Sequence, residues 1–145
     1  MPTYRFFLTL LIVSGFMVVS ARAVEDPFPL IPKYLKVATA LAADDLPAAR
    51  AEAQQLADDA IKLHHPGIGD SARAVAKADS LKAAREAFKT LSTPVIALAK
   101  QTKGYFILNC PMAQADWVQS TREVANPYFG KAMLSCGTVI EETKG

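Results

Sequence analysis

Between residues 32 and 100, apolar side chains recur every three or four positions in a stretch rich in alanine, leucine, lysine, glutamate and glutamine. That spacing puts the apolar side chains on one face of an α-helix, and these residue types favour helix formation. We therefore predict helices over residues 32–43, 46–63 and 70–91, followed by a fourth helix or a kinked continuation over residues 94–100. The predicted buried faces comprise Tyr34, Leu35, Ala38, Leu41 and Ala42; Ala49, Ala53, Leu56, Ala60 and Leu63; and Val75, Leu81, Ala84, Phe88 and Leu91.

Short breaks separate the predicted helices. Asp44 and Asp45 end the first helix and cap the second, residues 64–69 (His-His-Pro-Gly-Ile-Gly) break the chain again, and Thr93-Pro94 is typical of a new cap and first turn. Short connections and small alanine side chains let antiparallel helices pack closely. The predicted fold is mainly α, an up-and-down bundle of three to four helices.

The first 23 residues have the pattern of a cleavable signal peptide. Arg5 precedes an apolar run over residues 6–20, which is too short to span a bilayer comfortably, and a small-x-small sequence follows at residues 21–23. An uncleaved amino-terminal anchor is the alternative. Residues 24–32 contain three prolines and are predicted to form an extended lead-in, and residues 33–145 a single helical domain. We expect a periplasmic or extracellular protein that does not insert into the membrane after cleavage.

The charge of the remaining chain gives no sign of nucleic-acid binding. Two of the 16 basic residues lie in the leader and none of the 14 acidic ones does, so residues 24–145 carry no net formal charge. No run of lysine or arginine with interleaved aromatic residues occurs. A nucleic-acid partner is therefore not expected.

Beyond Gly104 the composition changes from helical to strand-like. Residues 105–108 and 138–140 are short aromatic or β-branched runs that we expect to pair as a small β-ribbon. Two sulfur clusters lie between or beside them, and they hold all the cysteines and methionines beyond the leader: Cys110 with Met112, and Met133 with Cys136. If the two strands pair, the four sulfurs converge, and soft thiolate and thioether ligands select Cu(I).

The same residues have a simpler interpretation. Two cysteines in an exported chain commonly form a disulfide, here Cys110 with Cys136, and the methionines would then fill the core. His64 and His65 are more typical of favourable partners for a helix terminus than of metal ligands. Trp117, Tyr128 and Phe129 are expected to form an aromatic cluster, in the core or along its wall.

No catalytic pattern is present in the sequence. It contains no His-Glu-x-x-His, no Gly-x-Ser-x-Gly, no glycine-rich phosphate loop and no Cys-x-x-Cys. A nucleophilic cysteine assisted by His64 or His65 has no supporting motif. We therefore expect a protein that is not an enzyme.

Five separated motifs follow one another along the chain. They include Cys110-Pro111-Met112-Ala113, Trp117, Asn126-Pro127-Tyr128-Phe129-Gly130 and Met133-Leu134-Ser135-Cys136-Gly137, and the similarity extends upstream through Tyr34-Leu35 and through Arg85, Phe88 and Leu91-Ser92. This pattern resembles an exported domain family of unknown function. Members occur alone behind signal peptides, or fused to periplasmic adaptor subunits of copper and silver efflux pumps of the resistance-nodulation-division type.

The resemblance implies a context, heavy-metal handling in the cell envelope, rather than a reaction. It favours an extracytoplasmic module that binds Cu(I) or a similar soft ion through Cys110, Met112, Met133 and Cys136, with a metal-efflux component as an envelope partner. The alternative is a metal-free, disulfide-stapled helical domain that docks on an envelope protein through its aromatic cluster. Both hypotheses require the two cysteine clusters to lie next to each other.

Overall fold

The computed structural model describes residues 28–145. The predicted signal peptide and residues 24–27 of the predicted lead-in lie outside this range. Four helices come first: α1 (Leu30–Ala42), α2 (Leu46–Lys62), α3 (Pro66–Ala76) and α4 (Leu81–Ala99). The strands β1 (Lys103–Cys110), β2 (Ala115–Gln119) and β3 (Thr138–Lys144) follow, with one turn of 3-10 helix at Gly130–Ala132. A mainly helical fold with a carboxy-terminal β element is thus confirmed.

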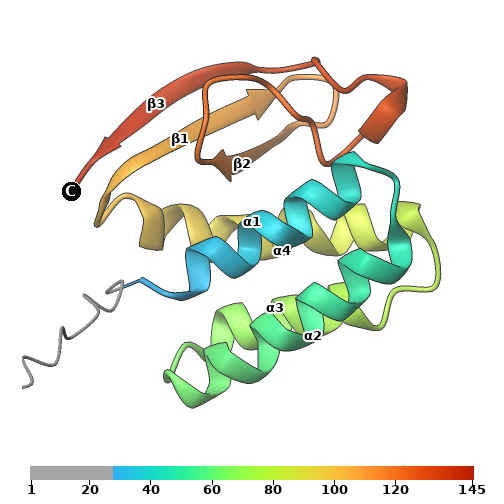
Figure 1. Ribbon diagram of the computed structural model, residues 1–145, viewed down its shortest axis with the longest axis vertical. Helices are drawn as coiled ribbons and strands as arrows, with labels where there is room; N and C mark the ends of the chain where they lie inside the picture. Colours follow the sequence, from blue (N-terminus) through green and yellow to red (C-terminus); the bar gives the residue numbers. More distant parts are fainter. Residues whose placement is uncertain (1–27) are drawn as a thin grey trace, which may run out of the picture.

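The elements form three layers, as Figure 1 shows. The sheet lies on one side of α1 and α4, and the pair α2 and α3 lies on their other side. Because α1 is covered on both sides, eight of its thirteen residues are buried, Tyr34 and Leu41 among them. Within residues 28–145, no helix combines the length and apolar character that crossing a membrane requires.

The first two helices end in the same hydrogen-bonded motif. At the end of α1 the Asp45 N–H donates to the Ala40 carbonyl at 2.9 Å, and Asp44 adopts a left-handed conformation with φ 60°. His64 takes that position after α2, with φ 61°. These are Schellman turns, which usually place glycine there. The Asp45 side chain then caps α2 by accepting from the Ala48 N–H at 2.9 Å, as predicted.

Several predicted boundaries differ from the structure. Helix α1 begins at Leu30, so the last three residues of the predicted extended lead-in are helical. The break after α2 is short, because Pro66 starts α3 directly, and Leu63 is 45% exposed rather than buried. The predicted helix over residues 70–91 is two helices: α3 ends at Ala76, and Ser80 caps α4 by accepting from the Ala83 N–H at 3.2 Å.

Pro94 lies inside α4 and starts no new helix. Of the two predicted alternatives, a fourth helix or a continuation, the structure shows the continuation. Proline removes one helical hydrogen bond, but Leu91 and Val95 on either side of it are fully buried against the core. Tertiary packing thus maintains the helix across the proline.

The sheet is antiparallel with strand order β2-β1-β3. The predicted pairing of the two carboxy-terminal runs is confirmed, with Leu108 opposite Val139 and Asn109 opposite Thr138. Strand β2 was not predicted, so the ribbon is a three-stranded sheet. Strand β2 is connected to β1 by the Pro111–Gln114 turn and pairs with it. The pairing places Trp117 opposite Leu108, and both side chains are fully buried.

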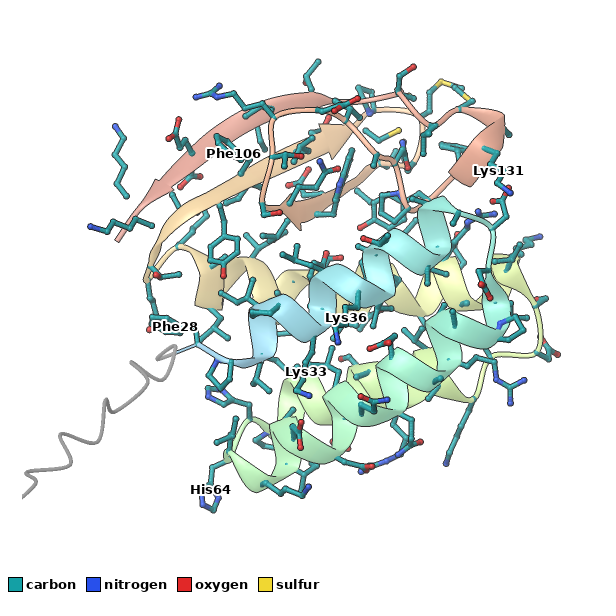
Figure 2. The ribbon with its side chains drawn as sticks, viewed as in Figure 1. Phe28, Lys33, Lys36, His64, Phe106 and Lys131 are labelled. Carbon is teal, nitrogen blue, oxygen red and sulfur yellow. The ribbon has the colours of Figure 1, made fainter. Side chains whose placement is uncertain are left out.

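Charged side chains surround this core, as Figure 2 shows. Lys33 on α1 lies 2.9 Å from the Asp59 carboxylate on α2, and Lys36 lies 4.0 Å from Glu52. Such partly exposed pairs contribute on the order of 1 kcal/mol or less each. The buried apolar faces of α1 and α2 therefore contribute more to the orientation of the two helices than these ion pairs do.

Candidate dithiol site

The two cysteines lie together at one end of the sheet. Cys110 is the last residue of β1 and is fully buried, whereas Cys136 precedes β3 and is half-buried. Their Sγ atoms are 3.3 Å apart. The antiparallel register explains this approach, because Asn109 is paired with Thr138, which brings Cys110 beside Gly137 and therefore close to Cys136. The predicted adjacency of Cys110 and Cys136 is confirmed.

The two thiols differ in how easily they ionise. Burial opposes ionisation of Cys110, but hydrogen bonds from the Ala113 and Met112 backbone and from the Cys136 and Asn126 side chains outweigh it, so the pKa of this thiol is lowered. The hydrogen bond that Cys136 makes to Cys110, together with burial, raises the pKa of the Cys136 thiol. Cys110 is thus the thiol of the pair that ionises more readily, and the hydrogen bond with the more accessible Cys136 favours its ionised form.

Asn126 holds the loop that carries Cys136. It is fully buried, and its Nδ2 donates to the Cys136 carbonyl at 2.6 Å while its backbone N–H donates to the Leu134 carbonyl at 2.8 Å. Its Oδ1 accepts from the Tyr128 N–H at 2.8 Å and the Phe129 N–H at 3.2 Å. Every polar atom of the side chain is therefore used to shape this loop.

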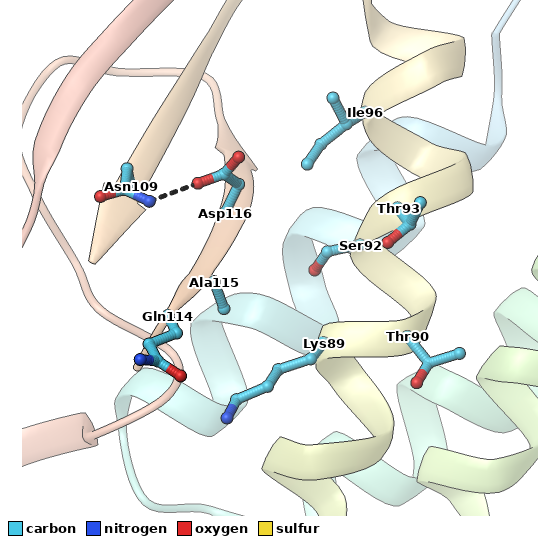
Figure 3. A pocket seen from close by; sticks show the side chains of 9 residues that line it. All are labelled: Lys89, Thr90, Ser92, Thr93, Ile96, Asn109, Gln114, Ala115 and Asp116. Carbon is cyan, nitrogen blue, oxygen red and sulfur yellow. Dashed lines mark hydrogen bonds between the residues drawn. The ribbon is translucent and has the colours of Figure 1, made fainter. Parts of the chain in front are cut away.

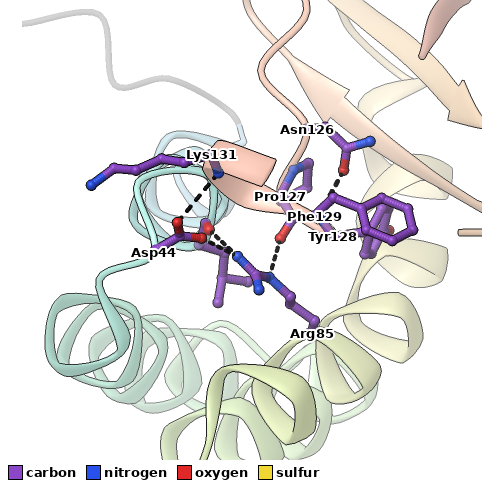
Figure 4. A network of polar contacts seen from close by, with 8 residues as sticks. Asp44, Arg85, Asn126, Pro127, Tyr128, Phe129 and Lys131 are labelled. Carbon is purple, nitrogen blue, oxygen red and sulfur yellow. Dashed lines mark hydrogen bonds and ion pairs between the residues drawn. The ribbon is translucent and has the colours of Figure 1, made fainter. Parts of the chain in front are cut away.

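An arginine ties the same loop to the helices, as Figure 4 shows. The Arg85 guanidinium on α4 donates to the Pro127 carbonyl at 3.0 Å, the Leu41 carbonyl at 3.0 Å and the Asp44 carboxylate at 2.5 Å. The hydrogen bond from Arg85 lowers the pKa of Asp44. Arg85 thereby joins α1, α4 and the loop at a single point.

Gly130 makes that junction possible. Its φ is 58°, and a Cβ atom there would lie 1.9 Å from Asp44 Oδ1 and 2.3 Å from Arg85 Nη2. Gly137, beside Cys136, has φ 144°, and a Cβ there would lie 2.6 Å from the Trp117 ring. Both glycines of the carboxy-terminal motifs are therefore required by backbone conformation and by close approach.

The aromatic residues of the motifs form part of the core. Trp117 is fully buried and Tyr128 is 5% exposed, with ring centroids 5.9 Å apart and planes at 88°. Tyr128 continues the cluster to Phe88, which stacks on Tyr34. Phe129 is half-buried. Trp117 and Tyr128 of the predicted cluster are thus internal, so these two rings cannot supply the docking surface of the second hypothesis.

Ser92 connects the two tyrosines of this cluster. Its Oγ lies 2.7 Å from the Tyr34 hydroxyl and 3.1 Å from the Tyr128 hydroxyl. The Tyr128 hydroxyl also donates to the Asp116 carbonyl at 2.5 Å, and the Tyr34 hydroxyl accepts from the Val118 N–H at 3.4 Å. This buried network fixes β2, and therefore the β1–β2 hairpin that holds Cys110, against the helices.

The methionines are placed differently from the thiols. Met112 is 66% exposed in the turn after β1, and Met133 is half-buried. Between residues 28 and 145, no hydrogen bond joins either thioether to a thiol, and no three histidine, cysteine, aspartate or glutamate side chains gather into a metal-binding group. His64 lies at the other end of the molecule from Lys131, which belongs to the loop before Cys136 (Figure 2).

Sequence reasoning had not assigned Asn126 or Arg85 to the site. The sequence contained one signal, since both belong to the motifs that accompany the cysteines, but their roles depend on contacts to residues far away along the chain, such as Arg85 to Pro127. Local patterns carry no information on such contacts.

The family described as "Protein of unknown function (DUF3347)" matches residues 30–105, which include all four helices and the start of β1. The chain belongs to this family. No curated protein and no solved structure matches it. The match ends before Cys110, so the DUF3347 region supplies the helical scaffold, and the candidate dithiol site lies in the segment that follows it.

Proposed function

We propose that Cys110 and Cys136 bind Cu(I) or a similar soft ion, in a module that handles heavy metals outside the cytoplasm. The observation that carries the proposal is a pair of thiols 3.3 Å apart, one of which has a lowered pKa. The thiolate is the form that binds metal, and soft sulfur ligands select Cu(I) over harder divalent ions. The backbone N–H groups of Ala113 and Met112 favour the ionised form of Cys110 and so lower the cost of forming the thiolate that a metal requires.

Distance alone does not separate a metal site from a disulfide. The spacing of 3.3 Å lies between the ~2.05 Å of a disulfide bond and the ~4.6 Å that two sulfurs on opposite sides of one ion would have at ~2.3 Å each. Each arrangement requires about 1 Å of movement. Cys136 is the residue that can move, because it is half-buried in a loop while Cys110 is at the end of a central strand.

The electrostatics favour metal binding over thiol–disulfide exchange. A catalyst of exchange attacks with an accessible sulfur of low pKa. Here the accessible sulfur, Cys136, has the raised pKa, and the sulfur with the lowered pKa, Cys110, is buried. The pair is therefore arranged to hold an ion rather than to attack a substrate, which supports a protein that is not an enzyme.

The neighbouring methionines extend the proposal to the entry of the metal. Met112 is 66% exposed and is two residues from Cys110. An exposed thioether can take up a soft ion from a donor and remain as a neutral ligand when the half-buried Cys136 and the buried Cys110 bind the ion as charged ligands. The cellular context, export followed by association with a metal-efflux component, rests on the leader pattern and on the resemblance of the motifs.

Cu(I) titration of the reduced protein tests the proposal, with native mass spectrometry for stoichiometry and a chromogenic chelator as competitor for affinity. One ion per chain is expected. Cys110→Ser and Cys136→Ser should each abolish tight binding, since each removes a thiolate. Met112→Leu and Met133→Leu should weaken binding while changing the free energy of unfolding by less than about 1.5 kcal/mol.

His64→Ala is the matched control, because this residue is exposed and lies far from the loop before Cys136. Its affinity for Cu(I) should equal that of the wild type. Undiminished binding by a double Cys110→Ser, Cys136→Ser variant would overturn the proposal. A protein isolated without free thiols, which takes up no Cu(I) after reduction, would instead establish the disulfide-stapled domain.

A further inference from the structure

A second feature lies on the opposite face of the β1–β2 hairpin from Cys110. A groove of about 700 Å³ separates the hairpin from α4, as Figure 3 shows. Its helical wall is one face of α4, formed by Lys89, Ser92, Thr93 and Ile96. Its other wall is formed by Asn109, Gln114 and Asp116. The groove is thus built from three elements whose positions the buried tyrosine network fixes.

Polar residues occupy positions of this sheet face where core residues are expected. Side chains alternate along a strand, so Asn109 lies on the same face as Ile107, and Asp116 on the same face as Val118. Ile107 and Val118 are buried against the helices. The next pair on this face, Asn109 opposite Asp116, lines the groove instead. Asn109 Nδ2 donates to Asp116 Oδ1 at 2.7 Å.

The charges on the two walls are opposite in sign. Asp116 is half-buried and accepts from one amide, and no ion pair among residues 28–145 includes it. Lys89 faces the same groove, and within residues 28–145 its ion pair is the one with the exposed Glu86 at 3.1 Å. A half-buried carboxylate without a cation favours a ligand that brings one, because charge-assisted hydrogen bonds are the strongest available to it.

Gln114 supplies an independent observation. It is one of three non-glycine residues with positive φ in the described range, with φ 51°, and its side chain lines the groove. A non-glycine residue in the left-handed region costs about 1 kcal/mol relative to glycine. Asp44 and His64 close helix ends, and Gln114 closes the Pro111–Gln114 turn, in which its N–H donates to the Pro111 carbonyl at 3.2 Å. In this conformation the Gln114 side chain brings an amide donor and acceptor to the groove.

We propose that this groove binds a small molecule that carries both an amine and a carboxylate, such as an amino acid or a short peptide. The amine donates to Asp116, the carboxylate faces Lys89, and the Gln114 and Thr93 side chains supply hydrogen bonds between them. The groove does not depend on the dithiol, because Asn109 and Cys110 are consecutive residues on opposite faces of β1. The two proposals can therefore fail separately.

Three probes test the chemistry: glycylglycine, propylamine and propionate, each titrated into ¹⁵N-labelled protein without metal. The readout is the shift of the Asn109 and Gln114 side-chain amide resonances. Glycylglycine should bind saturably, propylamine more weakly, and propionate most weakly. The absence of saturable shifts with all three probes up to about 10 mM, the range of a weak small-ligand site, would overturn the proposal. Equal affinities for glycylglycine and propylamine would show that the carboxylate of the ligand contributes nothing to binding, and would contradict that part of the proposal.

Variants assign the two charges. Asp116→Asn keeps the shape and the acceptor for Asn109, and it should weaken glycylglycine binding about tenfold or more, the usual effect of losing a charged hydrogen-bond partner. Lys89→Met should weaken glycylglycine binding as well, and methionine can replace the half-buried stem of this lysine without leaving a cavity. Lys82→Met is the matched control, because Lys82 is an exposed lysine of α4 outside the groove. Undiminished affinity in Asp116→Asn would contradict the proposal.

Discussion

Replacing Gly130 by alanine should destabilise the protein by about 2 to 5 kcal/mol. The backbone contributes the first part, since φ is 58° and an L-residue with a Cβ costs about 1–2 kcal/mol in the left-handed region. The new methyl group contributes the second part. It would lie 1.9 Å from Asp44 Oδ1 and 2.3 Å from Arg85 Nη2, and shifts forced by such overpacking typically cost about 1–3 kcal/mol.

Urea unfolding followed by tryptophan fluorescence and circular dichroism measures this loss directly. For a domain of this size the melting temperature should fall by roughly 10 °C. Gly67→Ala is the matched control, because Gly67 is in the first turn of α3 and a Cβ there meets nothing within 4 Å. Its stability should be unchanged, or raised by up to about 1 kcal/mol by better helix propensity.

A double-mutant cycle identifies the cause. If the alanine methyl group collides with the Asp44 carboxylate, Gly130→Ala should cost less in an Asp44→Gly background than in the wild type, because contacting residues do not behave additively. Equal stability losses for Gly130→Ala and Gly67→Ala would refute the reasoning. A full loss of stability that persists in the Asp44→Gly background would assign the loss to the backbone conformation and to the contact with Arg85.

Three further predictions concern the same scaffold. The lowered pKa of Asp44 means that its stabilising contribution is complete above the unfolded pKa near 4 and is lost as pH falls through the folded value, so the stability difference between the wild type and Asp44→Asn should narrow between about pH 5 and pH 2. Tyr128→Phe removes a buried hydrogen bond to the Asp116 carbonyl and should cost about 1–3 kcal/mol in urea unfolding, whereas unchanged stability would show that the bond contributes nothing. Gly137→Ala should displace Trp117 and change its near-ultraviolet circular dichroism, and an unchanged spectrum would contradict the close approach that the structure shows.

The helical part of the fold could be predicted because its signals are local. The stripe around Ala49, Ala53 and Leu56 and the cap at Asp45 depend on residues a few positions apart, and the structure confirms them. The break between α3 and α4 was missed, although Ser80 is a good cap, because the apolar period continues across it. Ser80 indicated the start of a helix, but the regular spacing of apolar residues on both sides of it favoured one continuous helix.

The sheet was harder to predict, for a reason visible in β2. Its middle residues, Asp116, Trp117 and Val118, do not alternate between polar and apolar. Trp117 contacts Tyr128 and Gly137 in the segment before β3, while Val118 packs on the helices, so both faces are buried. A strand buried on both faces lacks the two-residue period that identifies a strand. The pairing of β1 with β3 was predictable, since each is a compact run of β-branched and aromatic residues.

The candidate site combines predictable and unpredictable parts. The adjacency of Cys110 and Cys136 followed from the pairing of two strands. The asymmetry of their pKa values did not, because it depends on the backbone N–H groups of Ala113 and Met112 and on the Asn126 side chain. Those contacts are set by the conformation of two loops, and residue types alone do not specify it.

The two thiols are held by different parts of the molecule, and this gives the helical region a role in the site. Cys110 ends β1 and is fixed by the hairpin. Cys136 is held through its carbonyl by Asn126, and the next residue of that loop, Pro127, is bound by Arg85 from α4. The distance between the sulfurs therefore depends on how the sheet and the helices are packed. Through Arg85 and Asn126, the helices covered by the DUF3347 match therefore help to hold Cys136 next to Cys110.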